Sequence, residues 1–385
     1  AVRMANHSSN DTLFPDYDPE ESTKIYYWNE LLPALIVYAV TFLFGVCGNT
    51  LIIFTISRFR RMKSTTNIFL VSLAVADLML ILICIPVKIA KLFAFTWTFG
   101  AILCKFVHYM QNVSAMCSVF TLTAISIERY YAIIHPMKAK YICTISQAKK
   151  VILITWILSF LFSTPVFYIQ ILLPVGERIP AFYCVRAWHL LNWWRAYEIY
   201  MFLIILILPS IIICSSYGII CKEIWTVMNR RAGLREGFAV NTHDCDLHSD
   251  SCVVYNEGKT SMKVKFRIED KMMNDTDCTT MKQVISMLGV VVCLFLLCWS
   301  PVLILNILTS FQYVDKLNYG WTKEIRLAFH LLSYVNSCVN PVVYGFMSRY
   351  FRESFINSLC LCYKRERRPK ILYQTSVSHT KNSNL

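Results

Sequence analysis

Asp77 is an acidic residue deep inside a long apolar segment of this sequence. A lone carboxylate in such a segment must be protonated, paired or bound to a cation. The polar residues expected at a similar depth are Asn49, Ser118, Asn336, Ser337 and Asn340. With Asp77 they make an oxygen-rich set of low net charge that suits a sodium ion. The alternative is a protonated Asp77 in a hydrogen-bonded core network.

A second set of side chains shares one face of the helix predicted over residues 101–127. Spacings of three and four place side chains on one helical face, and this face carries Cys104, His108, Gln111, Ala115, Ser118 and Leu122. It is polar at one end and small in the middle. The same helix ends at Glu128-Arg129-Tyr130, where Glu128 or a carbonyl of an incoming partner can hold the guanidinium of Arg129.

Seven apolar runs must position these residues. Each exceeds the roughly 20 residues that a helix needs to cross a bilayer, and together they cover 31–57, 66–92, 101–127, 148–170, 197–221, 283–309 and 325–347. Hydrophobic residues make up 56% of the chain and charged residues 16%, whereas soluble domains contain about 25% charged residues. This composition argues against a disordered chain and against a soluble enzyme.

The basic residues indicate a topology. The 38 Lys and Arg, against 24 Asp and Glu, lie in short stretches between apolar runs, which does not fit a nucleic-acid-binding face. The positive-inside rule places the N-terminus outside and the C-terminus in the cytoplasm of a multi-pass plasma-membrane protein. The expected regions are an outer tail (1–30), a transmembrane domain (31–347) with a long cytoplasmic loop (222–282), a membrane-surface helix (348–362) and a cytoplasmic tail (363–385).

This topology assigns candidate modification sites to the two tails. Asn6 and Asn10 begin glycosylation sequons on the outer side. Tyr17 lies between two aspartates and is a candidate for sulfation. Cys360 and Cys362 follow the last run and suit palmitoylation of a helix on the membrane surface.

Two of the sixteen cysteines are expected to form a disulfide. Cys104 opens the third run at its outer end, and Cys184 lies in the connector between the fourth and fifth runs. Both face an oxidising compartment, whereas most of the others lie in apolar runs or on the reducing side.

Several short motifs follow one another in a characteristic order. The motifs are Gly48-Asn49, Leu73-Ala74-Val75-Ala76-Asp77, Trp97-Thr98-Phe99-Gly100 before Cys104, Glu128-Arg129-Tyr130, Trp156, Pro209 with Tyr217, Phe295 with Cys298-Trp299-Ser300-Pro301, and Asn340-Pro341-Val342-Val343-Tyr344. Through them the chain resembles the rhodopsin-like (class A) G-protein-coupled receptors over about residues 30–360. Each motif alone is weak, but their joint order and spacing are specific. Glu128 stands where the family more often has Asp.

The resemblance implies an all-α membrane protein, a seven-transmembrane helix bundle with a short amphipathic eighth helix. It also implies a switch in which an agonist moves Trp299 and Phe295, and the sixth helix swings about Pro301. A sodium site at Asp77, Ser118, Asn336 and Asn340 then collapses, while side chains at the cytoplasmic end rearrange. The switch and coupling residues implied are Glu128, Arg129, Tyr130, Met137, Tyr217, Phe295, Trp299, Pro301, Asn340, Pro341 and Tyr344.

The partners implied by the resemblance are a heterotrimeric G protein, arrestin, a receptor kinase and membrane lipids. The position of Met137 packs into the G protein in this family, and the calcium-mobilising class is favoured. Ser and Thr residues of the tail offer phosphorylation sites for arrestin binding. No cofactor is expected beyond an allosteric sodium ion.

The ligand is predicted to be an extracellular peptide. The pocket candidates suit a peptide with a polar or acidic part, whereas the acidic N-terminal tail, with Asp11, Asp16, Asp18, Glu20 and Glu21, would attract a basic peptide, and the two alternatives stay open. Gln111 replaces the Asp of aminergic receptors, and the seventh run has no inner Lys for retinal. The candidate ligand-binding residues are Lys88, His108, Gln111, Asn112, Glu198, Asn306, Arg326 and His330. The sequence is most similar to the branch of cholecystokinin, RFamide-type and orexin receptors.

Three alternatives stay open at this point. A class A receptor for a lipid or another small non-amine ligand is the main one. A transporter is more remote, because the sequence has no internal repeat. A membrane enzyme would need paired acids, an activated nucleophile or a metal motif within the spans, and none is complete.

Overall fold

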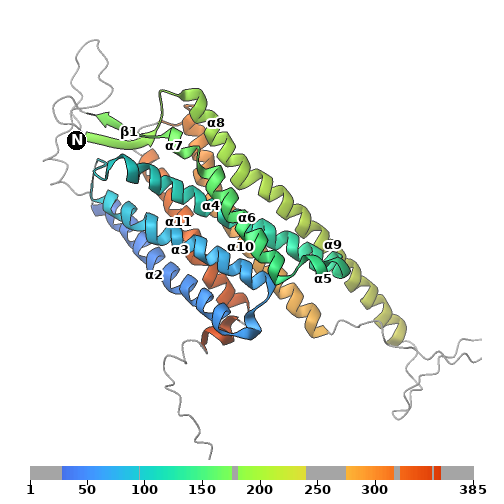
Figure 1. The fold of residues 1–385 in the computed structure, drawn as a ribbon. Helices are drawn as coiled ribbons and strands as arrows, with labels where there is room; N and C mark the ends of the chain where they lie inside the picture. Colours follow the sequence, from blue (N-terminus) through green and yellow to red (C-terminus); the bar gives the residue numbers. More distant parts are fainter. Residues whose placement is uncertain are drawn as a thin grey trace, which may run out of the picture.

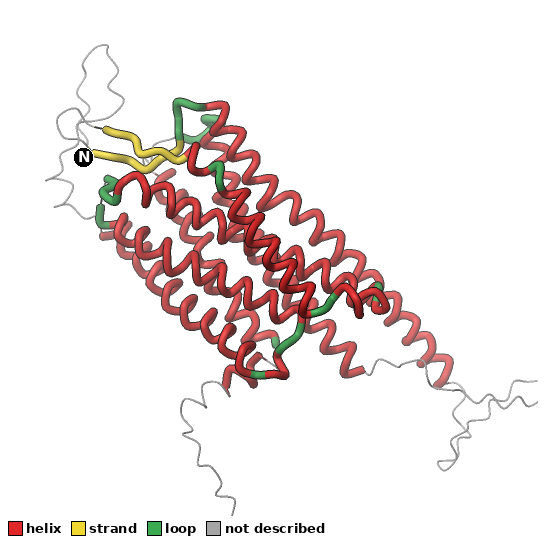
Figure 2. Tube along the Cα trace, in the orientation of Figure 1, coloured by secondary structure: helices red, strands yellow, loops and turns green. Residues whose placement is uncertain are grey.

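Long helices packed side by side dominate the computed structural model, and a two-stranded hairpin lies across one end (Figure 1). The structure describes residues 28–94, 96–175, 181–239, 275–315, 321–348 and 351–356. Nearly all of the described chain is helical (Figure 2). The predictions for Asn6, Asn10, Tyr17, Cys360 and Cys362 lie outside the described residues.

The helices follow the apolar runs of the sequence. The long ones are α2 (Trp28–Arg58), α3 (Thr65–Leu92), α4 (Gly100–Ile134), α6 (Ile145–Ser163), α9 (Leu208–Ala239), α10 (Asp275–Ser310) and α11 (Trp321–Met347). Helix α8 (Leu191–Phe202) continues through the π-helical turn η2 (Leu203–Ile207) into α9. The short elements are η1 (Arg60–Met62), α5 (Pro136–Ile142), α7 (Val166–Ile169), β1 (Gln170–Val175) and β2 (Ala181–Arg186).

Six helical segments of the described chain are long and apolar enough to cross a membrane. The seventh, α11, has a lower hydropathy because it carries polar residues along its length. Two of them, Asn336 and Asn340, are buried inside the bundle, and α11 packs between α10 and α2. The expected seven-helix architecture is confirmed, with the polar face of α11 turned inward as intramembrane polar residues require.

Local chemistry fixes where the helices begin and how closely they pack. The hydroxyl of Ser64 accepts a hydrogen bond from the backbone N–H of Asn67 and caps α3. A Cβ added at Gly48 would lie 2.6 Å from the Cβ of Pro341. Gly48 therefore lets α2 approach α11 at the depth of Asn49, which explains the glycine of that motif.

The helix ends differ in detail from the ranges expected from sequence. Helix α9 ends at Ala239 and α10 begins at Asp275, so both extend into the range 222–282 expected to be a connector. Residues 351–356 form a further short helix at the expected place of the eighth one. Its Phe351 stacks on Tyr344 with ring centroids 5.7 Å apart, which attaches it to the bundle.

Candidate functional site

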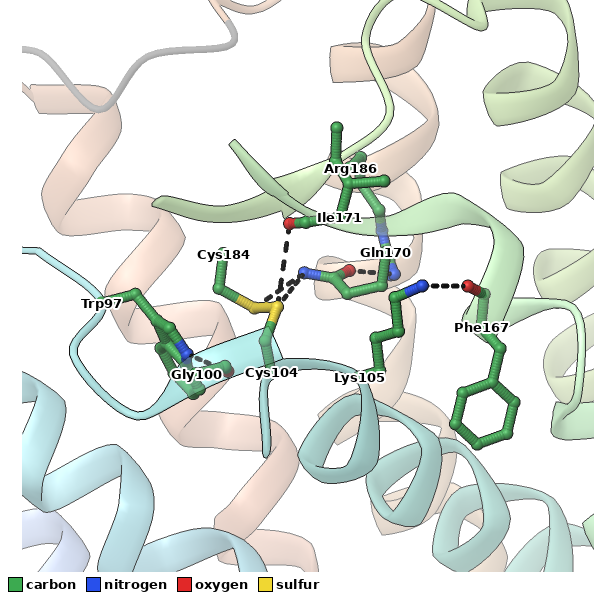
Figure 3. The surroundings of a disulfide bond; sticks show 9 residues. All are labelled: Trp97, Gly100, Cys104, Lys105, Phe167, Gln170, Ile171, Cys184 and Arg186. Atoms are coloured by element: carbon green, nitrogen blue, oxygen red, sulfur yellow. Dashed lines mark hydrogen bonds between the residues drawn. A yellow bond between two sulfur atoms is a disulfide. The ribbon is translucent and has the colours of Figure 1, made fainter. Parts of the chain in front are cut away.

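A disulfide ties the hairpin to the first turns of α4, as predicted. Cys104 and Cys184 are bonded, and β1 and β2 pair antiparallel with Leu172 opposite Cys184. Gln170 points at the two sulfurs in Figure 3, and its amide nitrogen lies 3.2 Å from the sulfur of Cys184. Nearby, the indole N–H of Trp97 donates to the carbonyl of Gly100 (Figure 3). The hairpin is thereby fixed over the end of the bundle where α4 begins.

Arg186 organises the space beneath the hairpin, although it was not among the predicted site residues. Its guanidinium donates to the Glu198 carboxylate at 3.1 Å and to the Gln170 side-chain oxygen at 2.8 Å. It also lies over the Tyr197 ring, 5.0 Å from the centroid. Burial opposes its charge, but Glu198 and Tyr197 more than compensate, so the pKa of Arg186 is raised above its ordinary value.

A sequence signal for Arg186 existed. Residues two apart on a strand face the same side, so Arg186 lies on the face of Cys184, which points at the bundle. Glu198 is only 2% exposed and also accepts from the indole N–H of Trp194 at 3.1 Å. The predicted ligand-binding residue Glu198 is thus already occupied by protein partners.

The polar residues of α4 contact neighbouring helices. The Tyr334 hydroxyl of α11 donates to the Gln111 side-chain oxygen at 3.1 Å, and both residues are buried. The Asn112 amide donates to the Tyr197 hydroxyl of α8 at 2.7 Å. Gln111 and Asn112 therefore connect α4 to two different helices, α11 and α8.

The remaining predicted ligand-binding residues lie toward the hairpin end. Arg326 donates to the Thr309 hydroxyl at 3.3 Å and to the carbonyl of Asp315 at 2.9 Å, which joins α11 to the end of α10. Lys88, His108, Asn306 and His330 are each partly buried. The Nδ1 atom of His330 is buried and has no hydrogen-bond partner within the described part of the chain.

Asp77 is hydrogen-bonded to one of the residues predicted to surround it, Asn340. The Asn340 amide donates to its Oδ2 atom at 2.8 Å, and the Asp77 side chain is buried. The Asn49 amide donates to the carbonyls of Gly45 and Ser337 at 2.9 and 2.8 Å. Within the described residues no hydrogen-bond partner reaches three buried oxygens, which are Oδ1 of Asn49, Asp77 and Asn336. Buried oxygens without a protein partner, Oδ1 of Asp77 among them, are ligands of the kind that a hard cation takes. Ser118 is buried as well.

At the other end of α4, the carboxylate of Glu128 holds Arg129. The guanidinium donates to Oε2 and Oε1 of Glu128 at 2.6 and 2.5 Å. The Thr66 hydroxyl of α3 also donates to Oε2 at 3.1 Å. Thr66 was not among the predicted site residues. Tyr130 lies edge-on to His135, with centroids 5.7 Å apart.

The aromatic residues of α9, α10 and α11 have unused polar atoms. Phe295 and Trp299, one turn apart on α10, stack with centroids 6.1 Å apart, and Trp299 precedes Pro301 by two residues. The Trp299 indole nitrogen and the hydroxyls of Tyr217 and Tyr344 are buried without partners in the described part of the chain. These three N–H and O–H groups can therefore donate hydrogen bonds to new partners if the helices change their arrangement.

Two further residues at this end are Met137 of α5 and Gln283 of α10. Met137 of α5 is 70% exposed, so its apolar side chain is open to a partner. The Gln283 amide of α10 donates to the carbonyl of Met347 at the end of α11. The hydrogen bond between Gln283 and Met347 was not predicted, because a local sequence pattern does not show which residues at the ends of two different helices come together.

The architecture is that of a polytopic helical membrane protein. The model of the 7 transmembrane receptor (rhodopsin family) matches residues 48–344. The chain belongs to this family and is a class A G-protein-coupled receptor, not an enzyme.

Curated relatives place it more closely. It is 32% identical to the rat gastrin/cholecystokinin type B receptor, over 89% of this chain and 82% of the relative. It is 31% identical to the human cholecystokinin receptor type A, over 92% and 85%. It is 29% identical to a cholecystokinin receptor of Xenopus laevis, over 86% and 77%.

Proposed function

We propose that the ligand is an extracellular peptide that enters at the hairpin end of the bundle. The similarity to cholecystokinin and gastrin receptors along most of both chains is the observation that carries this proposal. The polar residues of α3, α4, α8, α10 and α11 beneath a disulfide-fixed hairpin support it, because they offer a large polar surface to an elongated ligand. We include Gln111, Asn112, Asn306 and Arg326 in that surface.

The peptide shifts the bundle between two arrangements for which it has different affinities. Contact near Asn306 displaces Trp299 and Phe295, and α10 turns outward about Pro301. Tyr217 and Tyr344 then satisfy their buried hydroxyls on new partners, and Asn340 and Pro341 adjust within α11. Release of Arg129 from Glu128 opens a cleft at the far end, where Tyr130 and Met137 face the G protein.

The orientation and the remaining partners belong to the same proposal. The N-terminal tail (1–30), glycosylated at Asn6 and Asn10, lies outside the plasma membrane, and the C-terminus (363–385) lies in the cytoplasm. Coupling mobilises calcium, and the tail recruits a receptor kinase and arrestin after phosphorylation. Residues 348–362 lie on the membrane surface among lipids, with palmitate on Cys360 and Cys362.

A sodium ion held by Asp77, Ser118, Asn336 and Asn340 would stabilise the arrangement without agonist. We therefore predict that sodium lowers agonist affinity about tenfold in the wild type, a common size for coupling between two sites, and that Asp77→Asn abolishes this effect. Agonist binding to membranes in sodium and in N-methylglucamine buffer measures it. If agonist affinity depends equally on sodium in the wild type and in the variant, Asp77 does not hold a sodium ion.

Gln111 is expected to contribute directly to ligand binding. Gln111→Ala should lower agonist potency about tenfold, the effect of one lost hydrogen bond to a buried group. Gln147→Ala is the matched control, since Gln147 is exposed at the start of α6. Tyr334→Phe separates a direct effect from one through the contact with Tyr334. An unchanged dose–response for Gln111→Ala would make the residue structural.

The peptide proposal is tested by a ligand screen in cells that carry promiscuous G proteins, with calcium as the readout. A neuropeptide library that includes cholecystokinin and gastrin peptides is compared with a lipid library, in cells with and without the receptor. We expect at least one peptide to act only on receptor-bearing cells. Activation by lipids and by no peptide would overturn the proposal.

A further inference from the structure

The end of α10 nearest the hairpin is closed by a turn that accounts for most of its free carbonyl groups. The last four carbonyls of a helix have no partner within it, and in α10 they belong to residues 307–310. The N–H groups of residues 311–313 donate to three of them, those of Ile307, Thr309 and Leu308, at 3.0, 3.1 and 2.9 Å. The chain reverses at Gln312, whose φ of 67° is left-handed, as in a Schellman motif. The carbonyl of Ser310 is left for a partner outside the turn.

Arg195 of α8 is that partner. Its Nε–H donates to the carbonyl of Ser310 at 3.1 Å, and its guanidinium lies 5.1 Å from the centroid of the Phe311 ring. Ser310 is fully buried, so water cannot take the place of Arg195 there. A positive charge at the C-terminal end of a helix also interacts favourably with the helix dipole. Arg195 therefore joins α8 to the end of α10 through a hydrogen bond, a ring contact and its charge.

Arg326 holds the same end from a second helix, α11. Its guanidinium donates to the Thr309 hydroxyl at 3.3 Å and to the carbonyl of Asp315, beyond the turn, at 2.9 Å. The Thr309 hydroxyl itself donates to the carbonyl of Leu305 within α10 at 2.8 Å, which fixes its direction. Two guanidinium groups from two helices thus contact the final turn of α10.

The opposite end of α10 is held differently in the part of the chain that the structure describes. There the neutral amide of Gln283 donates to the carbonyl of Met347 at the end of α11. Charge-assisted hydrogen bonds are roughly twice as strong as neutral ones. Helix α10 packs closely on α8 and α11, whereas α9 and α10 are not among the closely packed pairs of helices. The hairpin end of α10 is therefore the harder end to move.

Pro301 lies between these two ends and divides α10 into unequal arms. A proline removes a backbone hydrogen bond from a helix and makes a kink at which it can bend. About 26 residues, roughly 39 Å, precede Pro301, and about 10 residues, roughly 15 Å, form the arm at the hairpin end. A rod that rocked about Pro301 by about 10° would move its two ends by roughly 7 and 3 Å. A helix that bent at Pro301 would move the long arm alone.

We propose that Arg195 and Arg326 anchor the hairpin end of α10 to α8 and α11, so that α10 opens by bending at Pro301 and not by rocking as one rod. The inference rests on the proposed outward movement of α10 and deepens it, because it names the residues that keep the short arm in place. An anchored short arm transmits a displacement of Trp299 to the long arm, whereas a free short arm would absorb part of it. Arg195 is the residue to test, because Arg326 also belongs to the proposed peptide surface.

Pulsed double electron–electron resonance on the full-length receptor in lipid nanodiscs distinguishes the two movements without any peptide. Introducing p-acetylphenylalanine at two positions and coupling it to a hydroxylamine nitroxide avoids the sixteen cysteines. One pair of labels, at Leu32 and Tyr313, spans the hairpin end, and the other, at Arg58 and Ser286, spans the far end. All four side chains are exposed, and α2 carries one label of each pair. Each pair is measured on the receptor alone and with a nucleotide-free heterotrimeric G protein.

In the wild type we expect the G protein to lengthen the distance at the far end by about 7 Å and to change the distance at the hairpin end by less than about 1 Å. Arg195→Met keeps an apolar side chain beside Phe311 but removes the donor. Its distance distribution at the hairpin end should be broader in the receptor alone and should shift by about 3 Å with the G protein. Arg195→Lys keeps the charge and should lie between the two. Asn192→Ala, at an exposed position of α8 one turn before Arg195, is the matched control and should behave as wild type.

Two results on the receptor alone would overturn the proposal. One is a distribution at the hairpin end that is the same in Arg195→Met as in wild type. The other is a wild-type distribution that is as broad at the hairpin end as at the far end. Neither result depends on a G protein or a peptide, so a failed peptide screen would leave these distances unaffected, and a free hairpin end of α10 would leave the screen unaffected.

Discussion

Replacing Glu198 by alanine is expected to destabilise the receptor by about 3 kcal/mol, because it leaves the Arg186 guanidinium without its carboxylate. Glu198 is buried and receives hydrogen bonds from both Arg186 and Trp194. Arg186 is 21% exposed, so water compensates only part of the loss. The thermal unfolding midpoint of the purified receptor should fall by about 5 °C or more.

Three further variants separate the ion pair from general effects of mutation. Glu198→Gln keeps an acceptor for Arg186 and Trp194 and should lose less. Arg186→Met combined with Glu198→Leu removes both charges and should recover much of the stability. Glu223→Ala, at an exposed position of α9, should leave Tm unchanged. An unaltered Tm for Glu198→Ala would mean that the pair does not stabilise the hairpin end of the bundle.

Arg129→Ala should reduce agonist-driven G-protein activation about thirtyfold or more while agonist binding persists. In the structure Glu128 holds the guanidinium through two short hydrogen bonds. We propose that agonist releases it to a carbonyl of the G protein, and loss of one charged partner at an interface costs about 2 kcal/mol or more, or about thirtyfold. Nucleotide exchange in membranes measures the effect.

The matched control for this variant is Arg58→Ala. Arg58 is an exposed arginine in the last turn of α2. It should signal as wild type. Radioligand or fluorescent-agonist binding establishes that both variants reach the membrane folded. Full signalling by Arg129→Ala would remove Arg129 from the coupling mechanism.

Much of the fold could be predicted because a bilayer imposes length and polarity on each helix. The seven apolar runs located the long helices, and the oxidising side of the predicted topology paired Cys104 with Cys184. Asp77 and Asn340 were correctly grouped, because two polar groups deep in apolar helices must find each other or an ion.

The contacts that could not be predicted join residues far apart in sequence. They depend on the direction in which each side chain points. The bond from Thr66 to Glu128 and the pair of Arg186 with Glu198 depend on how helices and hairpin rotate against one another. A pattern within one helix contains no information about that rotation. For the same reason Glu198 was grouped with free pocket residues, although protein partners already surround its carboxylate.

We propose that occupancy by a peptide at the hairpin end drives nucleotide exchange on a G protein at the opposite end. The most direct measurement uses purified full-length receptor in lipid nanodiscs with a heterotrimeric G protein, and compares GTP exchange with and without a peptide selected by the screen. We predict saturable acceleration that requires both receptor and peptide and that Arg129→Ala removes. If no peptide accelerates GTP exchange and a lipid ligand does so on the same receptor, the proposal of a peptide receptor is wrong.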